Sequence, residues 1–255
     1  MHVRPKKYLG QHFLNDKNIA RKIAESLKDL PDDAIVLEVG PGTGVLTDFL
    51  ISKYKNLVLV EKDRESVEFL RRKYSTDEMN IIQGDFLKLN LKELSGGKPL
   101  YVIGNFPYNI SSQIVFKVLE NRDIVEQMAG MFQKEVAERI ASPPGNKNYG
   151  ILSVLAQTYY EPKYLFTVLP HVFHPPPKVQ SGVIKLMRKK AEDEPDFEKY
   201  KKLVRSAFNQ RRKTLRNSLK SANLPFDKLE AEILSKRPEQ ISVEGFKNIY
   251  QQIVR

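Results

Sequence analysis

The residues Asn105-Phe106-Pro107-Tyr108 close the apolar run PLYVIG and have types that suit attack by an aromatic amine. The lone pair of such an amine is delocalised into the ring, so two acceptors facing its N–H bonds favour the nucleophilic form. The Asn105 side-chain oxygen and the Phe106 carbonyl could supply them, Pro107 fixes the turn, and the Tyr108 ring could stack on the base. No strong base is needed, because the amine becomes acidic once alkylated. The alternative is an ordinary Asn-x-Pro turn, which its place at a strand end disfavours.

A glycine-rich turn and two acids end three earlier apolar runs. The loop EVGPGTG places Gly40, Gly42 and Gly44 at every second position, which suits a tight turn with close backbone approach to a ligand. Glu61 ends the next run, about 20 residues on, where a carboxylate can accept both hydroxyls of a ribose. Asp85 ends the third run and could accept from an adenine amino group. Taken alone, the glycine turn could serve packing, Glu61 could be a solvated acid and Asp85 could be a helix N-cap. Taken together, the three predict a ligand that carries an adenosine.

A sheet must bring these residues together, and the apolar runs predict one. Runs at 35–40, 56–63, 80–85 and 99–105 recur at the length of a strand plus a crossover helix. This rhythm is typical of a parallel, doubly wound sheet, an α/β fold. In such sheets ligands bind beyond the carboxyl ends of the strands. The G-x-G-x-G spacing disfavours a dinucleotide oxidoreductase.

The rest of the chain is expected to complete this domain and add a second one. Helical spacing of Ile19, Ile23 and Leu27 predicts a first helix over 17–30. A composition break near Lys189–Pro195 divides residues 1–187, which begin with a basic segment at 1–16, from a small helical domain at 188–255. Further elements are expected at 111–120 (helix), 126–133, 164–169 and 181–187 (strands), and 196–208, 209–221, 226–236 and 242–254 (helices).

Composition narrows the class of protein. The chain has 255 residues, a formal net charge of +11 and a pI of about 9.5. This balance predicts a polyanionic partner, nucleic acid first and an anionic membrane surface second. The absence of cysteine excludes disulfides, thiolate zinc sites and cysteine nucleophiles. With no signal peptide and no run of about 20 apolar residues, we expect a soluble cytoplasmic protein.

The positive charge is concentrated near the C-terminus. No acidic residue lies within Lys201–Lys220, which holds eight basic ones. Arg212 and Arg216 are predicted to share a helix face. Any single basic residue here could equally well be exposed to solvent without binding RNA. The lack of acidic residues favours RNA docking for the cluster as a whole. The candidate phosphate contacts are Arg205, Arg211, Arg212, Lys213 and Arg216.

Several motifs together resemble a known family. EVGPGTG, Glu61, Asp85 and NFPYNIS are similar to the motifs of S-adenosylmethionine-dependent N6-adenine methyltransferases. YLGQHFLND, NFPYNIS and FHPPPKVQSG narrow the resemblance to the KsgA family of rRNA adenine dimethyltransferases, over about 7–218. The resemblance implies a Rossmann-like methyltransferase domain with a mostly parallel sheet and a small all-helical C-terminal domain. It also implies S-adenosylmethionine as cofactor and S-adenosylhomocysteine as product.

The resemblance assigns residues to the cofactor. The segment 11–14, which includes Phe13, is expected to line its methionine end. His12 stands where relatives often have Asn, so contact there is either through the backbone or through a side chain that replaces the amide. Phe106 stands where the family usually has Leu, which leaves its carbonyl in place. The implied cofactor-binding residues are Gln11, His12, Leu14, Gly40, Gly42, Gly44, Glu61, Lys62, Asp85, Phe86 and Asn105.

The Pro-rich segment is expected to complete the base pocket. Phe173 resembles the aromatic that closes over the second face of the target base, opposite Tyr108. Stacking of about 1–3 kcal/mol per base would offset part of the cost of extruding it. Lys178 could reach a phosphate. The alternative is a surface loop with a buried Phe and a solvated Lys.

Family resemblance also implies the reaction. Two methyl groups would go to N6 of each of two adjacent adenosines in the 3′-terminal hairpin loop of 16S rRNA, in the small ribosomal subunit. Loop adenosines suit this role because RNA is read mostly where bases can splay out. An Erm-like enzyme for 23S rRNA is one alternative, which LGQHFL and NQRRKTLRNSL disfavour, and a non-catalytic ribosome assembly factor is another. We expect a monomer with no metal and no membrane partner.

Overall fold

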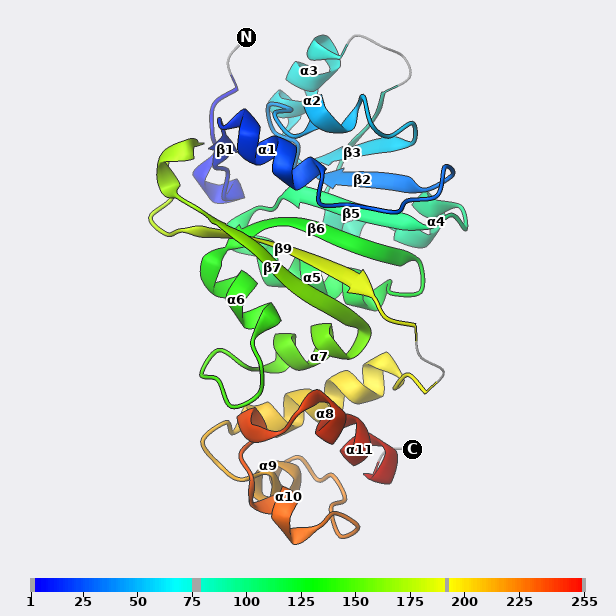
Figure 1. Ribbon diagram of the computed structural model, residues 1–255, viewed down its shortest axis with the longest axis vertical. Helices are drawn as coiled ribbons and strands as arrows, with labels where there is room; N and C mark the ends of the chain where they lie inside the picture. Colours follow the sequence, from blue (N-terminus) through cyan, green and yellow to red (C-terminus); the bar gives the residue numbers. More distant parts are fainter. Residues whose placement is uncertain (1–2, 75–78, 191–192, 254–255) are drawn as a thin grey trace. The chain divides into compact units, whose positions relative to one another are not determined.

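The computed structural model describes residues 3–74, 79–190 and 193–253 (Figure 1). The chain divides into two compact units, of which the first comprises Met1–Ala137 and Lys163–Arg188. The second comprises Glu138–Pro162 and Lys189–Arg255. The expected domain boundary after residue 187 lies next to the point after Arg188 where the chain finally leaves the first unit. Residues 138–162 were expected in the first domain, but they pack with the C-terminal helices. Two residues of the expected linker, 191 and 192, lie outside the described residues.

A seven-stranded sheet forms the centre of the first unit, in the order β4-β3-β2-β5-β6-β9-β7. The strands from β4 to β6 pair in parallel, and β9 pairs antiparallel with β6. This confirms the predicted α/β class with a mostly parallel sheet. The strands are β2 (Ile35–Val39), β3 (Leu57–Glu61), β4 (Asn80–Gln83), β5 (Leu100–Asn105), β6 (Val125–Gln133), β7 (Tyr160–Val168) and β9 (Ser181–Arg188).

The register of the parallel strands puts the polar strand ends at one edge of the sheet. Glu61 at the end of β3 lies opposite Gln83, and Asn105 at the end of β5 lies opposite Met131. All five residues of β3 are buried, as are five of the six in β5. Strands buried on both faces are continuous apolar runs, which is why the sequence shows them so clearly.

The helices of the first unit begin at identifiable caps. Asp16 accepts hydrogen bonds from the Asn18 and Ile19 amides at the start of α1, and Asp63 caps α3. Helix α1 ends well before the predicted residue 30, and Asp29 adopts a φ of 57°. The helices are α1 (Lys17–Ala24), α2 (Thr47–Leu50), α3 (Arg64–Lys73), α4 (Leu91–Ser95) and α5 (Ser111–Glu120).

A second, two-stranded sheet joins distant parts of the chain. Strand β1 (Phe13–Leu14) pairs antiparallel with β8 (Phe173–His174), with Leu14 opposite Phe173. The Asn15 amide extends this contact by donating to the Val172 carbonyl at 2.8 Å. The N-terminal segment is therefore held against the Pro-rich segment.

Helices of the second unit pack around an aromatic core. The Tyr200 ring lies edge-on to those of Tyr159 and Tyr250, and Phe208 stacks on Phe246. The chain crosses between units within α6 (Lys134–Ala141). The other helices are α7 (Ile151–Tyr159), α8 (Phe197–Asn209), α9 (Leu215–Ser221), α10 (Ala231–Ser235) and α11 (Val243–Ile253). Within the described residues, no helix is both long and apolar enough to span a membrane.

Two predicted C-terminal helices are shorter than expected. The helix predicted over 209–221 begins only at Leu215, because the chain leaves helical geometry at Gln210 and re-enters after Thr214. Arg211, Arg212 and Lys213 therefore lie in a turn, and the prediction that Arg212 and Arg216 share a helix face is wrong. The helix predicted over 226–236 is present only as α10. Residue 254 of the last predicted helix lies outside the described residues.

Candidate active site

A cavity of about 220 Å³ lies at the carboxyl ends of the parallel strands. Its wall combines the N-terminal segment, the glycine turn after β2, the ends of β3 and β5, and the turn after β4. Most residues predicted to bind the cofactor and all four of the predicted catalytic turn therefore meet in one place. The cofactor-binding ones are Gln11, His12, Gly40, Gly42, Glu61, Lys62, Asp85, Phe86 and Asn105, and the turn adds Phe106, Pro107 and Tyr108.

The glycine turn has different roles at its three positions. Gly42 has a φ of +58°, and a Cβ there would lie 2.8 Å from Cε1 of Phe13, so the turn fits against this ring only as glycine. Gly40, at φ +70°, shares the cavity wall with Gly42. A Cβ at Gly44 would instead meet the Tyr74 hydroxyl at 2.5 Å. Gly44 is not among the residues of the wall, and the closeness of Tyr74 gives it a packing reason to be glycine.

Glu61 is held in place by backbone donors. It is 5% exposed. The Gly42 amide donates to its Oε2 at 3.0 Å and the Asp63 amide to its Oε1 at 2.8 Å. Burial raises the pKa of the carboxyl, and the two amide hydrogen bonds offset part of the rise. Each oxygen keeps a second lone pair for a hydroxyl donor.

Asp85 caps a short helix and also lies on the cavity wall. Its Oδ1 accepts from the Leu87 amide at 3.0 Å, which caps a short 3-10 helix, while its carboxylate forms part of the cavity wall. Its Oδ2 lies 2.9 Å from Nζ of Lys62. Burial would raise the pKa of Asp85, but the Lys62 ion pair and the Leu87 amide bring it below its usual value. The carboxylate is therefore an acceptor at neutral pH.

The Asn105 turn is fixed from three sides. Asn105 Nδ2 donates to the His12 carbonyl at 2.9 Å, so its amide oxygen is the free acceptor end of the group. The Phe106 amide donates to the Met131 carbonyl at 3.0 Å, and the Phe106 ring packs on Phe132 with centroids 4.7 Å apart. Pro107 follows with a φ of −57°. The turn is thus preorganised by hydrogen bonds and by packing.

Tyr108 is restrained at its hydroxyl and beside its ring. Its hydroxyl is hydrogen-bonded to Oγ of the buried Ser181 on β9. Its ring centroid lies 5.3 Å from that of His12, with the planes at 33°. Burial raises the pKa of Tyr108, which the hydrogen bond with Ser181 opposes in part. The phenol therefore stays protonated at neutral pH.

The structure does not bring Phe173 to the cavity. The ring is 3% exposed and lies in the core cluster that also contains Leu14. Pairing of β1 with β8 places it there, and in this position no face of it is open to a base. Leu14, 4% exposed, is likewise behind the wall. Lys178 is exposed.

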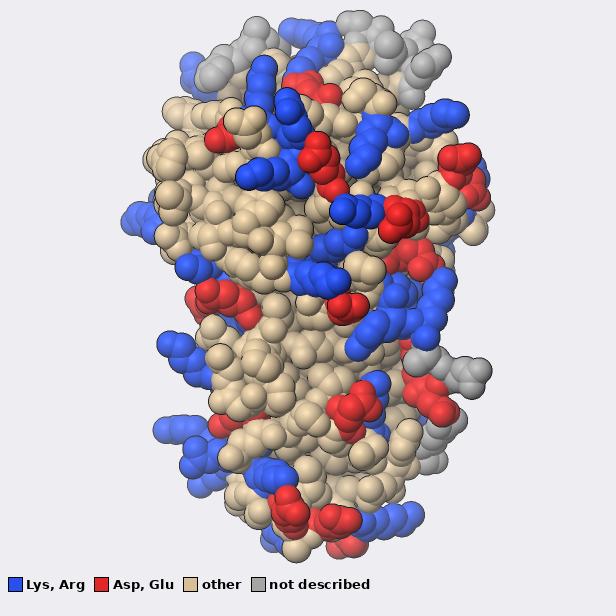
Figure 2. Space-filling view, viewed as in Figure 1, with Lys and Arg blue, Asp and Glu red and all other residues tan. Residues whose placement is uncertain are grey.

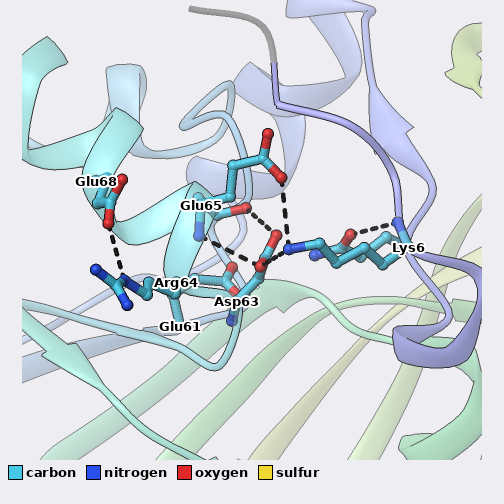
Figure 3. A network of polar contacts seen from close by, with 8 residues as sticks. Lys6, Glu61, Asp63, Arg64, Glu65 and Glu68 are labelled. Atoms are coloured by element: carbon cyan, nitrogen blue, oxygen red, sulfur yellow. Dashed lines mark hydrogen bonds and ion pairs between the residues drawn. The ribbon is translucent and has the colours of Figure 1, made fainter.

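An unpredicted ion-pair network anchors the N-terminal segment (Figure 3). Figure 3 shows the Lys6 ammonium pointing at Asp63 and Glu65, just after the end of β3. The Lys6 amide also donates to Oε1 of Gln11 at 2.8 Å. The hydrogen bond with Asp63 raises the pKa of Lys6. Burial of Asp63 would raise the pKa of its carboxyl, but the bond with Lys6 brings that pKa below its usual value. Sequence reasoning missed Lys6 because its partners are far away in the chain.

The predicted phosphate contacts from 205 to 216 lie in the second unit and differ in their surroundings. Arg211 donates to the Lys147 carbonyl at 2.6 Å and lies 3.9 Å from Glu239, so it supports the local fold. Arg216 lies over the Phe226 ring at 5.7 Å. Arg205, Arg212 and Lys213 are exposed. Figure 2 shows Lys and Arg interspersed with Asp and Glu on the face in view, so bulk charge alone does not mark the RNA-binding surface there.

Fold and site together define a methyltransferase of the Rossmann-like class. The chain is similar to a solved dimethyladenosine transferase from Plasmodium falciparum, with a TM-score of 0.80 and 27% identity over 96% of this chain and 100% of that one. It is also similar to the solved 23S rRNA methyltransferase ErmE, with a TM-score of 0.72 and 27% identity over 94% and 100%.

Sequence comparison then gives the family. Residues 3–251 match the model of the ribosomal RNA adenine dimethylase family, and the chain belongs to this family. Curated proteins called ribosomal RNA small subunit methyltransferase A match it closely. The one from Bacteroides thetaiotaomicron is 53% identical over 98% of this chain and 94% of its own length, and the one from Flavobacterium johnsoniae is 54% identical over 98% and 96%.

Proposed function

We propose that this enzyme transfers methyl groups from S-adenosylmethionine to N6 of two adjacent adenosines in the 3′-terminal hairpin loop of 16S rRNA, within the small ribosomal subunit. The observation that carries the proposal is the cavity in which Glu61 and Asp85 face the same space as the Asn105 turn. Small-subunit specificity is favoured over a 23S target because the small-subunit relatives are 53–54% identical and ErmE 27%. Monomeric state and cytoplasmic location stay predictions.

The donor set of the cavity fits this cofactor. Glu61 offers carboxylate oxygens to a ribose, and Asp85 offers an acceptor to an adenine amino group. The backbone of Gly40 and Gly42 permits close approach of the ligand because neither residue has a side chain. When bound, the cofactor supplies an electrophilic methyl group on a sulfonium ion. Gln11, His12, Lys62 and Phe86 line the remaining wall.

The turn after β5 acts on the adenine. The Asn105 amide oxygen and the Phe106 carbonyl accept from the N6 amine and orient its lone pair. After one methylation a single N–H remains, and one acceptor still orients it. Tyr108 stacks on the base. Since these groups are fixed before the substrate arrives, their contribution is preorganisation of position and charge.

RNA docking is proposed for the second unit and for Lys178. Arg212 and Lys213 are the best candidates there, because they are exposed and lie in the turn before α9. Arg205 and Arg216 remain proposed contacts on α8 and α9. Arg211 is a weaker candidate, since its guanidinium bonds to Lys147 and Glu239. Phe173 is proposed to stack on the base only if β1 and β8 separate.

Methyl incorporation tests the proposal. Wild-type protein, Asn105→Ala and the control Asn80→Ala, which alters an exposed residue of β4, are given tritiated S-adenosylmethionine. Each receives unmodified small subunits, large subunits and protein-free rRNA, and the products are digested and separated. The expected result is N6,N6-dimethyladenosine from small subunits with wild type and Asn80→Ala, and its loss with Asn105→Ala.

Other outcomes would contradict specific parts of the proposal. Label in large-subunit rRNA would favour the Erm-like alternative. Tight binding of small subunits without label would favour the assembly-factor alternative. Full label with Asn105→Ala would remove the proposed role of the turn while keeping the activity.

A further inference from the structure

We infer that the His12 side chain is a positioning residue that holds the Tyr108 ring in its stacking orientation and couples it to the Pro-rich segment after β8. The inference rests on the proposed function, in which Tyr108 stacks on the target adenine. His12 lines the cavity beside both Tyr108 and Asn105.

The imidazole of His12 is fixed by a single directional hydrogen bond. Its Nδ1 lies 2.8 Å from the Pro175 carbonyl oxygen, which can only accept, so Nδ1 carries the hydrogen. This bond sets the plane of the ring. The ring in turn lies 5.3 Å from the Tyr108 ring, tilted by 33°, which is within the range of favourable aromatic contacts.

Tyr108 is thus held at two places by different parts of the fold. Ser181 on β9 binds its hydroxyl, and His12, anchored to Pro175, supports its ring. A ring held only at Cβ and at the hydroxyl could still rotate about the axis that joins them. The His12 contact removes this freedom before the base arrives, which lowers the entropy cost of binding.

Backbone and side chain of His12 act on different partners. Its carbonyl oxygen accepts from Asn105 Nδ2 at 2.9 Å, and this bond is kept in any His12 variant that folds. Side-chain substitutions therefore separate the orientation of Tyr108 from that of Asn105. They are also expected to leave the contacts of the cofactor's adenosine, at Glu61 and Asp85, unchanged.

The variants separate the ring of His12 from its hydrogen bond. His12→Phe keeps a ring and loses the donor, His12→Asn keeps a donor to Pro175 and loses the ring, and His12→Ala loses both. His171→Ala, at an exposed position, is the control. Three quantities are measured. The first is the ring resonances of protein labelled with [ring-13C]tyrosine, with Tyr108 assigned from Tyr108→Phe. The others are the single-turnover methyl-transfer rate with small subunits and the affinity for S-adenosylhomocysteine.

In His12→Ala the Tyr108 resonance should shift or broaden. The transfer rate should fall by about tenfold to a hundredfold. The affinity for S-adenosylhomocysteine should fall much less than the transfer rate, because the side chain acts on the rate through Tyr108 and the adenosine contacts at Glu61 and Asp85 are kept. The Phe and Asn variants should each recover part of the lost rate, and His171→Ala should match wild type in every measurement.

Two results would overturn the inference: an unshifted Tyr108 resonance in His12→Ala, or a rate loss matched by an equal loss of S-adenosylhomocysteine affinity. If His12→Ala does not fold, the same two criteria are applied to His12→Asn, which lacks the ring. Failure of the proposed function is a separate outcome. It would appear as wild-type protein that transfers no methyl group to small subunits, and the resonance measurement does not depend on it.

Discussion

The Gly42 amide donates a 3.0 Å hydrogen bond to Oε2 of Glu61, which joins the turn after β2 to the end of β3. A second amide, from Asp63, holds the other oxygen of Glu61. The carboxylate proposed to bind the ribose is therefore oriented by the same glycine turn that lines the cavity. A change in the turn should affect both at once.

Gly42→Ala should reduce stability and cofactor affinity together. The new Cβ would lie 2.8 Å from Phe13 at a φ of +58°. Gly97→Ala is the matched control, because Gly97 has a φ of +83° but no atom within 4 Å of the position that a Cβ would take. The control should lose about 1–2 kcal/mol from backbone strain alone. Gly42→Ala should lose more, measured by urea unfolding, and should bind S-adenosylhomocysteine at least about tenfold more weakly. Equal losses in the two variants would show that the Phe13 contact is unimportant.

Glu38 should make stability fall as the pH rises. This carboxyl is 1% exposed and accepts from Oγ1 of Thr47 at 2.7 Å, and burial raises its pKa to about 8. Between the unfolded value near 4.5 and about 8, the folded state holds a proton that the unfolded state has lost. This contribution is complete below pH 4.5 and is lost as the pH rises to 8, by at most about 1.4 kcal/mol per pH unit.

Glu38→Gln removes that titration and keeps an acceptor for Thr47. Urea unfolding at pH 5.5, 7 and 8 should show the variant gaining stability relative to wild type at each step. Glu68→Gln, on the outer part of α3, should run parallel to wild type. A parallel curve for Glu38→Gln would mean that Glu38 is ionised in the folded protein.

Lys6→Met should be more destabilising than the loss of an exposed ion pair. The Asp63 side chain is 2% exposed, so removal of Lys6 leaves a buried carboxylate without its cation, at a cost of about 3 kcal/mol. In the pair of Arg64 with Glu68 the side chains are 80% and 38% exposed, and Arg64→Met should cost less than about 0.5 kcal/mol. Urea unfolding at pH 7 compares the two. Similar losses would argue against the role of Lys6 as the anchor of the N-terminal segment.

Charge reversal at Arg212 and Lys213 should flatten the salt dependence of binding to small subunits. For two lost phosphate contacts the slope of log K against log salt should fall by about 1.4–1.8. Lys55→Glu with Lys98→Glu makes the same charge change at exposed residues of the first unit and should alter the slope less. S-adenosylhomocysteine affinity should be unchanged in both. An unaltered slope in the first variant would exclude these residues as phosphate contacts.

The strand ends could be predicted from sequence because each is encoded locally. The buried strands β3 and β5 are continuous apolar runs that end in Glu61 and Asn105, and Asp85 follows β4 after Gly84. What failed depends on distant contacts or on weak local signals. The burial of Phe173 follows from its pairing with Leu14. The turn at Arg212 contains no Gly or Pro, so nothing in its sequence marks the end of the helix before it.

The hydrogen bond between His12 and Pro175 joins residues 163 positions apart. A chain is synthesised from its N-terminus, so the glycine turn and six of the seven strands of the large sheet leave the ribosome before Pro175 does. Contacts of such long separation also form late, because the intervening loop must be closed first. The residues that line the cavity end at Ile110, so a nascent chain holds the whole wall before the Pro175 carbonyl that anchors the His12 side chain has been made.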